Sequence, residues 1–308
     1  MDINLGTFYS RLGSIALILA LGFFLGRKKL ISTETNRQIV NLLLSVFMPA
    51  ALFSAFPNEY SSNTAGFFFS GLIAGIIVMV MLVLLSKILF NKYFYRGKLR
   101  YEIQFALIFN NATFLGYPIV SNTFGQEGIL AYCGFIIAFN IALFSYGIYL
   151  FRHQIDKKLV KETVTNPNII AVLVGMVIFL TAIKLPSFFT DAVQFVGNAT
   201  TPLSVICVGF MLSHANFKKL LQKWSLSIPA LLQLIIGPLA TFFILKLLHF
   251  PTEVISVCTL IQALPTATSL SLFATKYGGN DIESSELVAL STLISVVTMP
   301  IMVALLLG

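Results

Sequence analysis

Ten apolar runs, each long enough to cross a bilayer, constrain the fold of this chain more than any other feature. A membrane-crossing helix needs about 20 mostly apolar residues. Five such runs precede a polar stretch from Arg152 to Asn166, and five follow it. In order, they cover residues 8–26, 37–56, 66–90, 101–124, 129–151, 168–184, 189–213, 225–248, 253–275 and 286–307. The sequence therefore predicts an all-α integral membrane protein with ten transmembrane helices.

The composition agrees with a membrane protein and argues against a soluble one. Only 10% of the residues are charged, whereas soluble proteins carry about 25%. The net charge of +8 comes from short Lys and Arg clusters between apolar runs, without the basic face of a nucleic-acid-binding protein. Cys133, Cys207 and Cys258 lie in separate runs, which matches neither a disulfide framework nor a metal site. We expect no cofactor, no metal and no nucleic-acid partner.

The positions of the basic residues predict the orientation in the membrane. Nearly all of the 20 Lys and Arg residues lie in the odd-numbered connections between runs, and the exceptions are Arg11, Lys184 and Lys246. The positive-inside rule assigns the basic side to the cytoplasm. We therefore expect a multi-pass protein of the inner or plasma membrane, with both chain ends outside the cytoplasm.

Two halves with five runs each must enter the membrane in opposite directions, because five is an odd number. The second run of each half contains a proline, Pro49 or Pro202, and so does the fourth, Pro118 or Pro265. The sequence thus predicts two related, inverted halves. We expect a first five-helix repeat over residues 1–151, a cytoplasmic linker over 152–166 and a second, inverted repeat over 167–308.

Amides, glycine and proline interrupt the fourth run from Phe109 to Pro118 and the ninth from Gln262 to Ser269. Paired interruptions of this kind indicate a transporter site, because the ends of broken helices meet there. Half-helix N-termini carry partial positive charge, so they attract an anion without Lys or Arg. We predict helix breaks at Gly116, Pro118 and Pro265. We predict substrate contacts from Asn110, Asn111, Thr113, Asn140, Gln262 and Thr266.

Several alternatives stay open at this point. Each proline taken singly is compatible with a simple kink, and Asn140 with a hydrogen bond between helices. We find no clear ionisable residue inside a run, since Arg11, Lys87 and Lys246 lie near run ends. No Ser/His pair, carboxylate pair or metal-ligand cluster occurs at depth, so we do not expect an enzyme. A membrane sensor without catalytic activity is the alternative to a carrier. Neutral oxygens can hold sodium, which leaves the coupling ion open.

At these residues the sequence resembles the auxin efflux carrier family, which includes plant auxin exporters and bacterial carriers described as malate or malonate permeases. The resemblance covers essentially the whole chain. The stretches that carry it are Met48 to Phe53, Asn111 through Gly116 to Pro118, Pro202-Leu203 leading to Gly209, Ala263-Leu264-Pro265 followed by Phe273-Ala274 and Tyr277, and Met299-Pro300.

The resemblance implies a fold like that of bile-acid sodium symporters, in which helices 4 and 9 are broken and cross at the substrate site. Helices 1, 2, 6 and 7 would form a scaffold, often dimeric, against which helices 3–5 and 8–10 move as an elevator. Asn111 matches the Asn that contacts substrate in the plant carriers. Two departures from those carriers, the short linker and the absence of an Asp/Lys pair in helices 2 and 3, favour malate or malonate over auxin-like anions.

Overall fold

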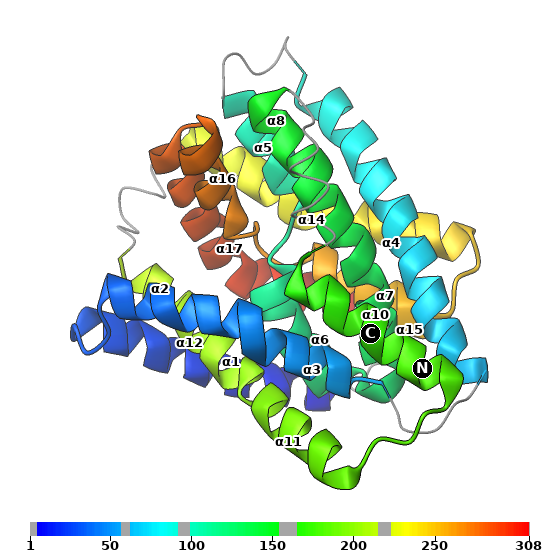
Figure 1. The fold of residues 1–308 in the computed structure, drawn as a ribbon. Helices are drawn as coiled ribbons and strands as arrows, with labels where there is room; N and C mark the ends of the chain where they lie inside the picture. The colour runs from blue at the N-terminus through cyan, green and yellow to red at the C-terminus, as the bar shows by residue number, and fades with distance from the viewer. Residues whose placement is uncertain (1–4, 57–61, 92–98, 154–164, 215–222, 308) are drawn as a thin grey trace.

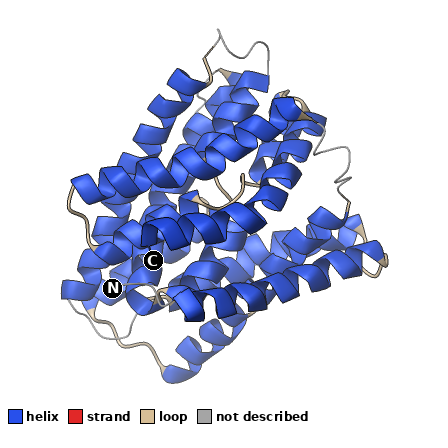
Figure 2. Ribbon diagram, turned by 180° about the vertical axis from the view of Figure 1, so that it is seen from behind, coloured by secondary structure: helices blue, strands red, loops and turns tan. Residues whose placement is uncertain are grey.

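The computed structural model describes residues 5–56, 62–91, 99–153, 165–214 and 223–307. Every named element in these ranges is a helix (Figures 1 and 2). Seven helical stretches there are long and apolar enough to cross a membrane: Tyr9–Arg27, Thr33–Ser54, Ala65–Leu89, Gly125–Arg152, Ser187–Ser213, Trp224–Leu247 and Asp281–Leu307. These features confirm the predicted class of an all-α integral membrane protein. Most of the predicted linker, residues 154–164, lies outside the described residues.

The helices follow the predicted apolar runs in order. In the first half they are α1 (Leu5–Arg27), α2 (Thr33–Leu42), η1 (Leu43–Phe47), α3 (Met48–Ser54), α4 (Ser62–Leu89), α5 (Leu99–Ile108), η2 (Ala112–Gly116), α6 (Tyr117–Thr123), α7 (Gly125–Ala142), η3 (Leu143–Gly147) and α8 (Ile148–Arg152). In the second half they are α10 (Pro167–Thr181), α11 (Ser187–Asn198), α12 (Thr200–Ser213), α14 (Trp224–Leu247), α15 (Thr252–Gln262), α16 (Ser269–Tyr277) and α17 (Asp281–Leu307).

Three of the predicted runs contain only shorter helices. The fourth and ninth runs are each split into two parts, α5 and η2–α6 in one case and α15 and α16 in the other. The sixth run forms α10, which has 15 residues. A helix of that length rises about 22 Å, less than the roughly 30 Å of a hydrocarbon core.

The helices pack as two groups, and Figure 1 shows α1, α2, α11 and α12 in the lower part of the view and α5, α8, α14 and α16 in the upper part. In the first group, α1 lies along α12, and α3 contacts both α10 and α11. In the second, α4 lies along α7, and α14 packs against α5, α15 and α17. Glycine allows close approach in both groups, since a Cβ at Gly22 or Gly71 would collide with the backbone of α12 or α7.

The outer face of α4 has the character of a lipid-facing surface. Ile73, Ile76, Val80, Leu84 and Ile88 recur every three or four residues, and each is more than half exposed. That spacing puts them on one side of the helix. A continuous apolar stripe of this size on an exposed helix is expected where the helix contacts lipid tails rather than water.

The expectation of no ionisable residue inside a run is wrong at Glu102. This residue is fully buried in the first turn of α5. Its Oε1 accepts a 2.6 Å hydrogen bond from the backbone N–H of Asn280, in the turn between α16 and α17. A carboxylate is stabilised near a helix N-terminus and by a charge-assisted hydrogen bond. The partner is remote in sequence, so the run alone could not indicate this burial.

Candidate substrate site at the helix crossing

The interruptions of the fourth and ninth runs meet and pair through their backbones. The Asn111 N–H donates to the Pro265 carbonyl at 2.7 Å, and the Ala267 N–H donates to the Phe109 carbonyl at 2.8 Å. These bonds form an isolated antiparallel bridge between Asn110 and Thr266. Unwound backbone at membrane depth must be satisfied inside the protein. Here each broken helix satisfies groups of the other.

Asn110 and Asn111 hold the two sides of the crossing in different ways. The Asn110 Nδ2 donates to the carbonyls of Ile261 and Gln262, at 3.0 and 2.8 Å, which caps the C-terminal end of α15. The Asn111 Oδ1 accepts the N–H of Phe114 at 3.3 Å, so Asn111 is the N-cap of η2. The two adjacent amides therefore end one half-helix and begin another.

Pro265 lies in the unwound segment of the ninth run, as predicted. It lacks a backbone N–H and disfavours helical geometry in the preceding residue. Side chains from two other helices, α14 and α17, form hydrogen bonds with groups of this unwound segment. The Gln233 side chain accepts from the Thr266 hydroxyl at 2.9 Å and donates to the Leu264 carbonyl at 3.1 Å, while the Ser291 Oγ accepts the Thr266 N–H at 3.1 Å.

The structure puts Gly116 and Pro118 inside helical segments rather than in the unwound segment of the fourth run. That segment is Phe109–Asn111, whereas Gly116 ends the π-helical turn η2 and Pro118 follows in the first turn of α6. Because proline donates no N–H, the preceding turn is free to widen into π-helical form. Pro118 thus coincides with a change of helical form and not with the crossing itself.

A cavity of about 220 Å³ lies against the crossing. Four of the predicted contact residues line it: Asn110, Asn111, Thr113 and Asn140. Gln262 and Thr266 are not among its lining residues, and both side chains are fully buried. Sequence reasoning missed further polar residues in the wall: Ser45, Asn166, Asn168, Thr268 and Ser269. The Asn166-Pro167 pair could have been noticed, since an N-cap residue before proline marks a helix start.

The polar end of the cavity has unpaired groups and the N-termini of two helices. The Asn111 Nδ2, the Asn168 Oδ1 and the Ser269 Oγ are buried atoms without a hydrogen-bond partner. Asn166 caps the start of α10, and Thr268 precedes the first residue of α16. Among the described residues that line the cavity, none is Lys, Arg, Asp or Glu. The electrostatics of this space therefore come from amides, hydroxyls and helix ends.

The remaining wall of the cavity is apolar. Phe114, Phe139, Phe144 and Phe273 line it, and Phe139 is almost fully buried. A site with a few convergent polar groups in an otherwise apolar wall is typical of small-molecule binding. Such a cavity can orient a small ligand with its polar group toward Asn111 and its carbon skeleton against the rings.

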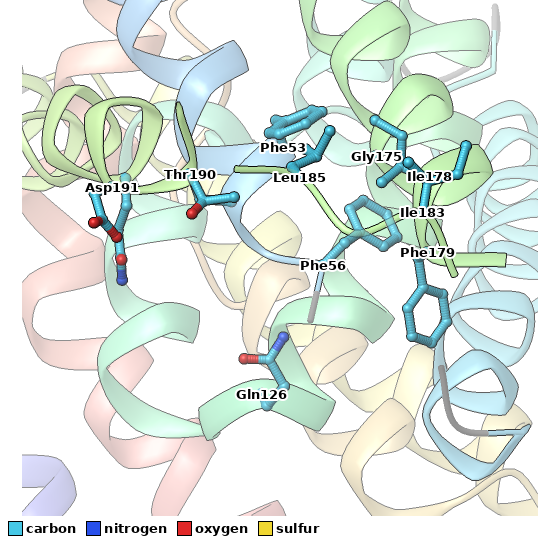
Figure 3. Close-up of a pocket in the computed structure, with 12 residues that line it drawn as sticks. Phe53, Phe56, Gln126, Gly175, Ile178, Phe179, Ile183, Leu185, Thr190 and Asp191 are labelled. Atoms are coloured by element: carbon cyan, nitrogen blue, oxygen red, sulfur yellow. The ribbon is translucent and has the colours of Figure 1, made fainter. Parts of the chain in front are cut away.

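A second cavity, of about 230 Å³, lies between α3, α7, α10 and α11. Figure 3 shows Thr190 and Asp191 at one end, the α10 residues at the other, Phe53 and Phe56 between them, and Gln126 below. The Gln126 side chain donates to the Ala55 carbonyl, which connects α7 to the end of α3. A third, polar cavity of about 530 Å³ adjoins it and shares Ser54, Gln126 and Gln194. Both contain residues of the two helix groups.

A bundle of apolar helices in which two broken helices pair beside a cavity is typical of a membrane transport protein. The sequence profile of the family described as membrane transport protein matches residues 7–158 and 151–303 of this chain. The chain belongs to this family, the auxin efflux carriers. The resemblance found in the sequence is thereby confirmed.

Curated relatives over most of the chain are also transporters by name. An uncharacterized transporter of Methanocaldococcus jannaschii is 25% identical over 85% of this chain and 87% of its own length. The uncharacterized transporter YfdV of Escherichia coli is 24% identical, with 93% and 94% covered, and one from Methanothermobacter thermautotrophicus is 22% identical, with 94% and 95% covered. These names favour a transporter over a sensor or an enzyme.

Proposed function

We propose that this protein is a secondary transporter that moves small organic anions across the cell membrane by an elevator-type alternating-access mechanism. The observation that carries the proposal is the cavity at the crossing, whose lining includes both Asn111, with its unpaired Nδ2, and the first residues of α16. An amide N–H and a helix N-terminus both favour negative charge. None of the described lining residues is Asp or Glu, so no carboxylate there repels an anion.

The lining of the cavity supports the substrate class that we propose. A carboxylate fits the polar end, where Asn111, Thr113 and Ser269 offer hydrogen bonds. Malate- and malonate-like acids are our first candidates. Auxin-like anions with an aromatic body are the second, because Phe114 and Phe273 also line the cavity.

The two helix groups support an elevator movement. We assign α1, α2, α3, α10, α11 and α12 to a scaffold, and the helices of the second group to a transport domain that contains the crossing. The cavity at the crossing involves Ser45 in η1, while the second and third cavities involve Ser54 near the other end of the same helical run. Residues nine apart on a helix differ by about 13 Å in height. Cavities between the two groups at different heights along this run are compatible with the alternating access that we propose.

The order of the helices and the basic clusters support the topology that we propose. Ten crossings in two inverted five-helix repeats would explain why the broken runs occupy the fourth place of each half. The basic connections would lie in the cytoplasm and both chain ends outside it. We further propose a homodimer formed through the scaffold group, in which α1 exposes Leu17, Leu21 and Phe24.

Uptake by purified protein in liposomes tests the proposed function. Radiolabelled malonate, malate and indole-3-acetate are offered separately, with and without an imposed sodium or pH gradient. We expect saturable uptake of at least one carboxylate above that of protein-free liposomes, and competition by unlabelled acid. Uptake of none of these anions, or preferential uptake of an organic cation, contradicts the proposal.

A further inference from the structure

Basic and aromatic side chains gather where α4 ends, α5 begins and α8 ends. The connections that join α4 to α5 and α8 to α10 belong to the basic side of the sequence, which we propose to be cytoplasmic. One lysine comes from α4, an arginine and a tyrosine come from α5, and the rest come from η3 and α8. We call these six residues the basic-aromatic cluster: Lys87, Arg100, Tyr101, Tyr146, Tyr149 and His153.

The side chains of the cluster form one connected line. The Lys87 Nζ lies 5.5 Å from the centroid of the Tyr146 ring, and the centroids of the Tyr146 and Tyr149 rings are 5.9 Å apart. The His153 ring then contacts two tyrosines, with its centroid 6.1 Å from that of Tyr149 and 4.6 Å from that of Tyr101. Residues from three helical segments are thus in mutual contact.

Arg100 lies at the other end of this line. Its guanidinium carbon is 4.4 Å from the centroid of the Tyr101 ring, and its Nη2 donates to the Tyr101 hydroxyl at 2.6 Å. One turn later, the Gln104 side chain donates to the Phe90 carbonyl at 2.8 Å, which fastens α5 to the end of α4. The line therefore has a cation at each end, Lys87 and Arg100.

The two cations of the cluster are not neutralised by a carboxylate of the described residues. Neither Lys87 nor Arg100 forms a salt bridge there. Glu102 is close in sequence, but it is fully buried and accepts the Asn280 N–H. Lys87 is exposed and Arg100 is partly exposed, so an external anion has access to both. The aromatic rings beside the cations favour their charged forms.

Lys87 continues the lipid-facing stripe of α4. It follows Val80 by seven residues and Leu84 by three, which puts it on the same side of the helix as these exposed residues. Inorganic phosphate would use only the charged end of this surface. A phospholipid matches both parts, because its phosphate suits the cations and its acyl chains suit the stripe. A lipid with a net negative headgroup is favoured over one whose headgroup adds an ammonium.

We propose that the basic-aromatic cluster binds the headgroup of one anionic phospholipid, with the phosphate at Lys87, the headgroup over the tyrosines toward Arg100, and the acyl chains along α4. The assignment to the cytoplasmic leaflet rests on the proposed topology. The binding itself does not depend on the proposed anion transport.

Native mass spectrometry of the purified protein in detergent tests the site. The probes are phosphatidylglycerol, phosphatidylcholine with the same acyl chains, and glycerol phosphate, which has the charged group without the chains. We expect phosphatidylglycerol to bind at least about fivefold more tightly than phosphatidylcholine, since each basic residue at a membrane surface favours an anionic lipid by about that factor. Glycerol phosphate should bind more weakly than phosphatidylglycerol, because it buries no acyl chain.

Four variants localise the binding. Lys87→Gln should weaken phosphatidylglycerol binding about fivefold, and Arg100→Gln should weaken it less. Lys87→Arg keeps the charge and should retain most of the affinity. Lys28→Gln is the matched control, because Lys28 also lies over a ring, 5.6 Å from the centroid of Phe24, but belongs to α1. It removes the same charge outside the cluster and should leave the affinity of the site unchanged.

Equal affinity for phosphatidylglycerol and phosphatidylcholine overturns the proposal. Equal losses in Lys87→Gln and Lys28→Gln overturn it as well, since they assign the preference to general attraction between basic residues and anionic lipid. Glycerol phosphate that binds as tightly as phosphatidylglycerol makes the cluster a site for free phosphate, which contradicts the lipid. Because no organic acid is present, each of these results is independent of whether the protein transports carboxylates.

Discussion

Asn111→Asp exchanges an amide for a carboxylate at the polar end of the cavity and leaves the local fold intact. Asn111 is the N-cap of η2, and its Oδ1 accepts the Phe114 N–H. Aspartate is as good an N-cap as asparagine, and its charge is favourable at a helix N-terminus. What changes is the unpaired Nδ2, which becomes a second carboxylate oxygen. We expect similar folded yield and a large loss of anion transport.

The size of the loss follows from the repulsion between two negative charges. At a separation of about 4 Å and an effective dielectric constant near 20, this repulsion is about 4 kcal/mol, roughly a thousandfold in affinity. Uptake of a proton by the introduced carboxylate removes the charge. The transport defect should therefore be largest at pH 7 and smaller at pH 5.

Asn111→Ser is the matched control for charge. Serine also caps a helix but supplies neither the amide donor nor a negative charge. We expect its uptake to lie between those of the wild-type protein and Asn111→Asp, with no recovery in acid beyond that of the wild-type protein. Asn110→Asp is not a suitable control, because it would replace the donor to Ile261 and Gln262 with a carboxylate facing two carbonyls.

The test compares the wild-type protein, Asn111→Asp and Asn111→Ser. Uptake of the carboxylate that the wild-type protein transports best is measured for each at pH 7 and pH 5. Near-normal uptake by Asn111→Asp at pH 7 would refute the reasoning, since it would remove Asn111 from the anion site. Equal defects in Asn111→Asp and Asn111→Ser at both pH values would show that loss of the amide donor, and not charge, is responsible.

Three further predictions concern the break, the buried acid and the topology. Pro265→Ala restores a backbone N–H in the ninth run and should reduce transport sharply at unchanged yield, and unchanged uptake would reduce Pro265 to a structural kink. Glu102→Ala leaves the Asn280 N–H unpaired and should lower the free energy of unfolding by about 1–3 kcal/mol, whereas Glu102→Gln retains the acceptor and should lose less. Single cysteines at Gly97 and Lys158 should be labelled from the cytoplasm and those at Tyr60 and Gly308 from outside, and a cytoplasmic Gly308 would contradict ten crossings.

The sequence was sufficient for the fold class and for the places where helices are interrupted. Apolar runs of membrane length require helices, because backbone groups in lipid must bond internally. The polar residues around Asn111 and Pro265 were therefore visible as exceptions. Four of the predicted contact residues line one cavity for the same reason, since polar groups at membrane depth gather around enclosed space.

The details that escaped prediction depend on contacts between distant parts of the chain. Asn110 pairs with the end of α15, and Gln233 and Ser291 hold Thr266 from α14 and α17. No local pattern marks such partners. The unwound segment also lies before Pro118, because the two asparagines end one half-helix and cap the next. The presence of Pro118 indicated an irregular helix there, but it did not indicate which turn is unwound.

The charge preference of the crossing is the central claim, and competition between a carboxylate and its neutral amide tests it most directly. Uptake of radiolabelled malonate into liposomes, or of the best carboxylate found, is measured against increasing unlabelled acid and against its diamide, which has nearly the same shape. The account predicts that the acid competes and that the amide competes at least about tenfold less well, because the helix N-termini and the Asn111 amide favour negative charge. Equal competition by acid and amide, or stronger competition by the amide, would contradict it.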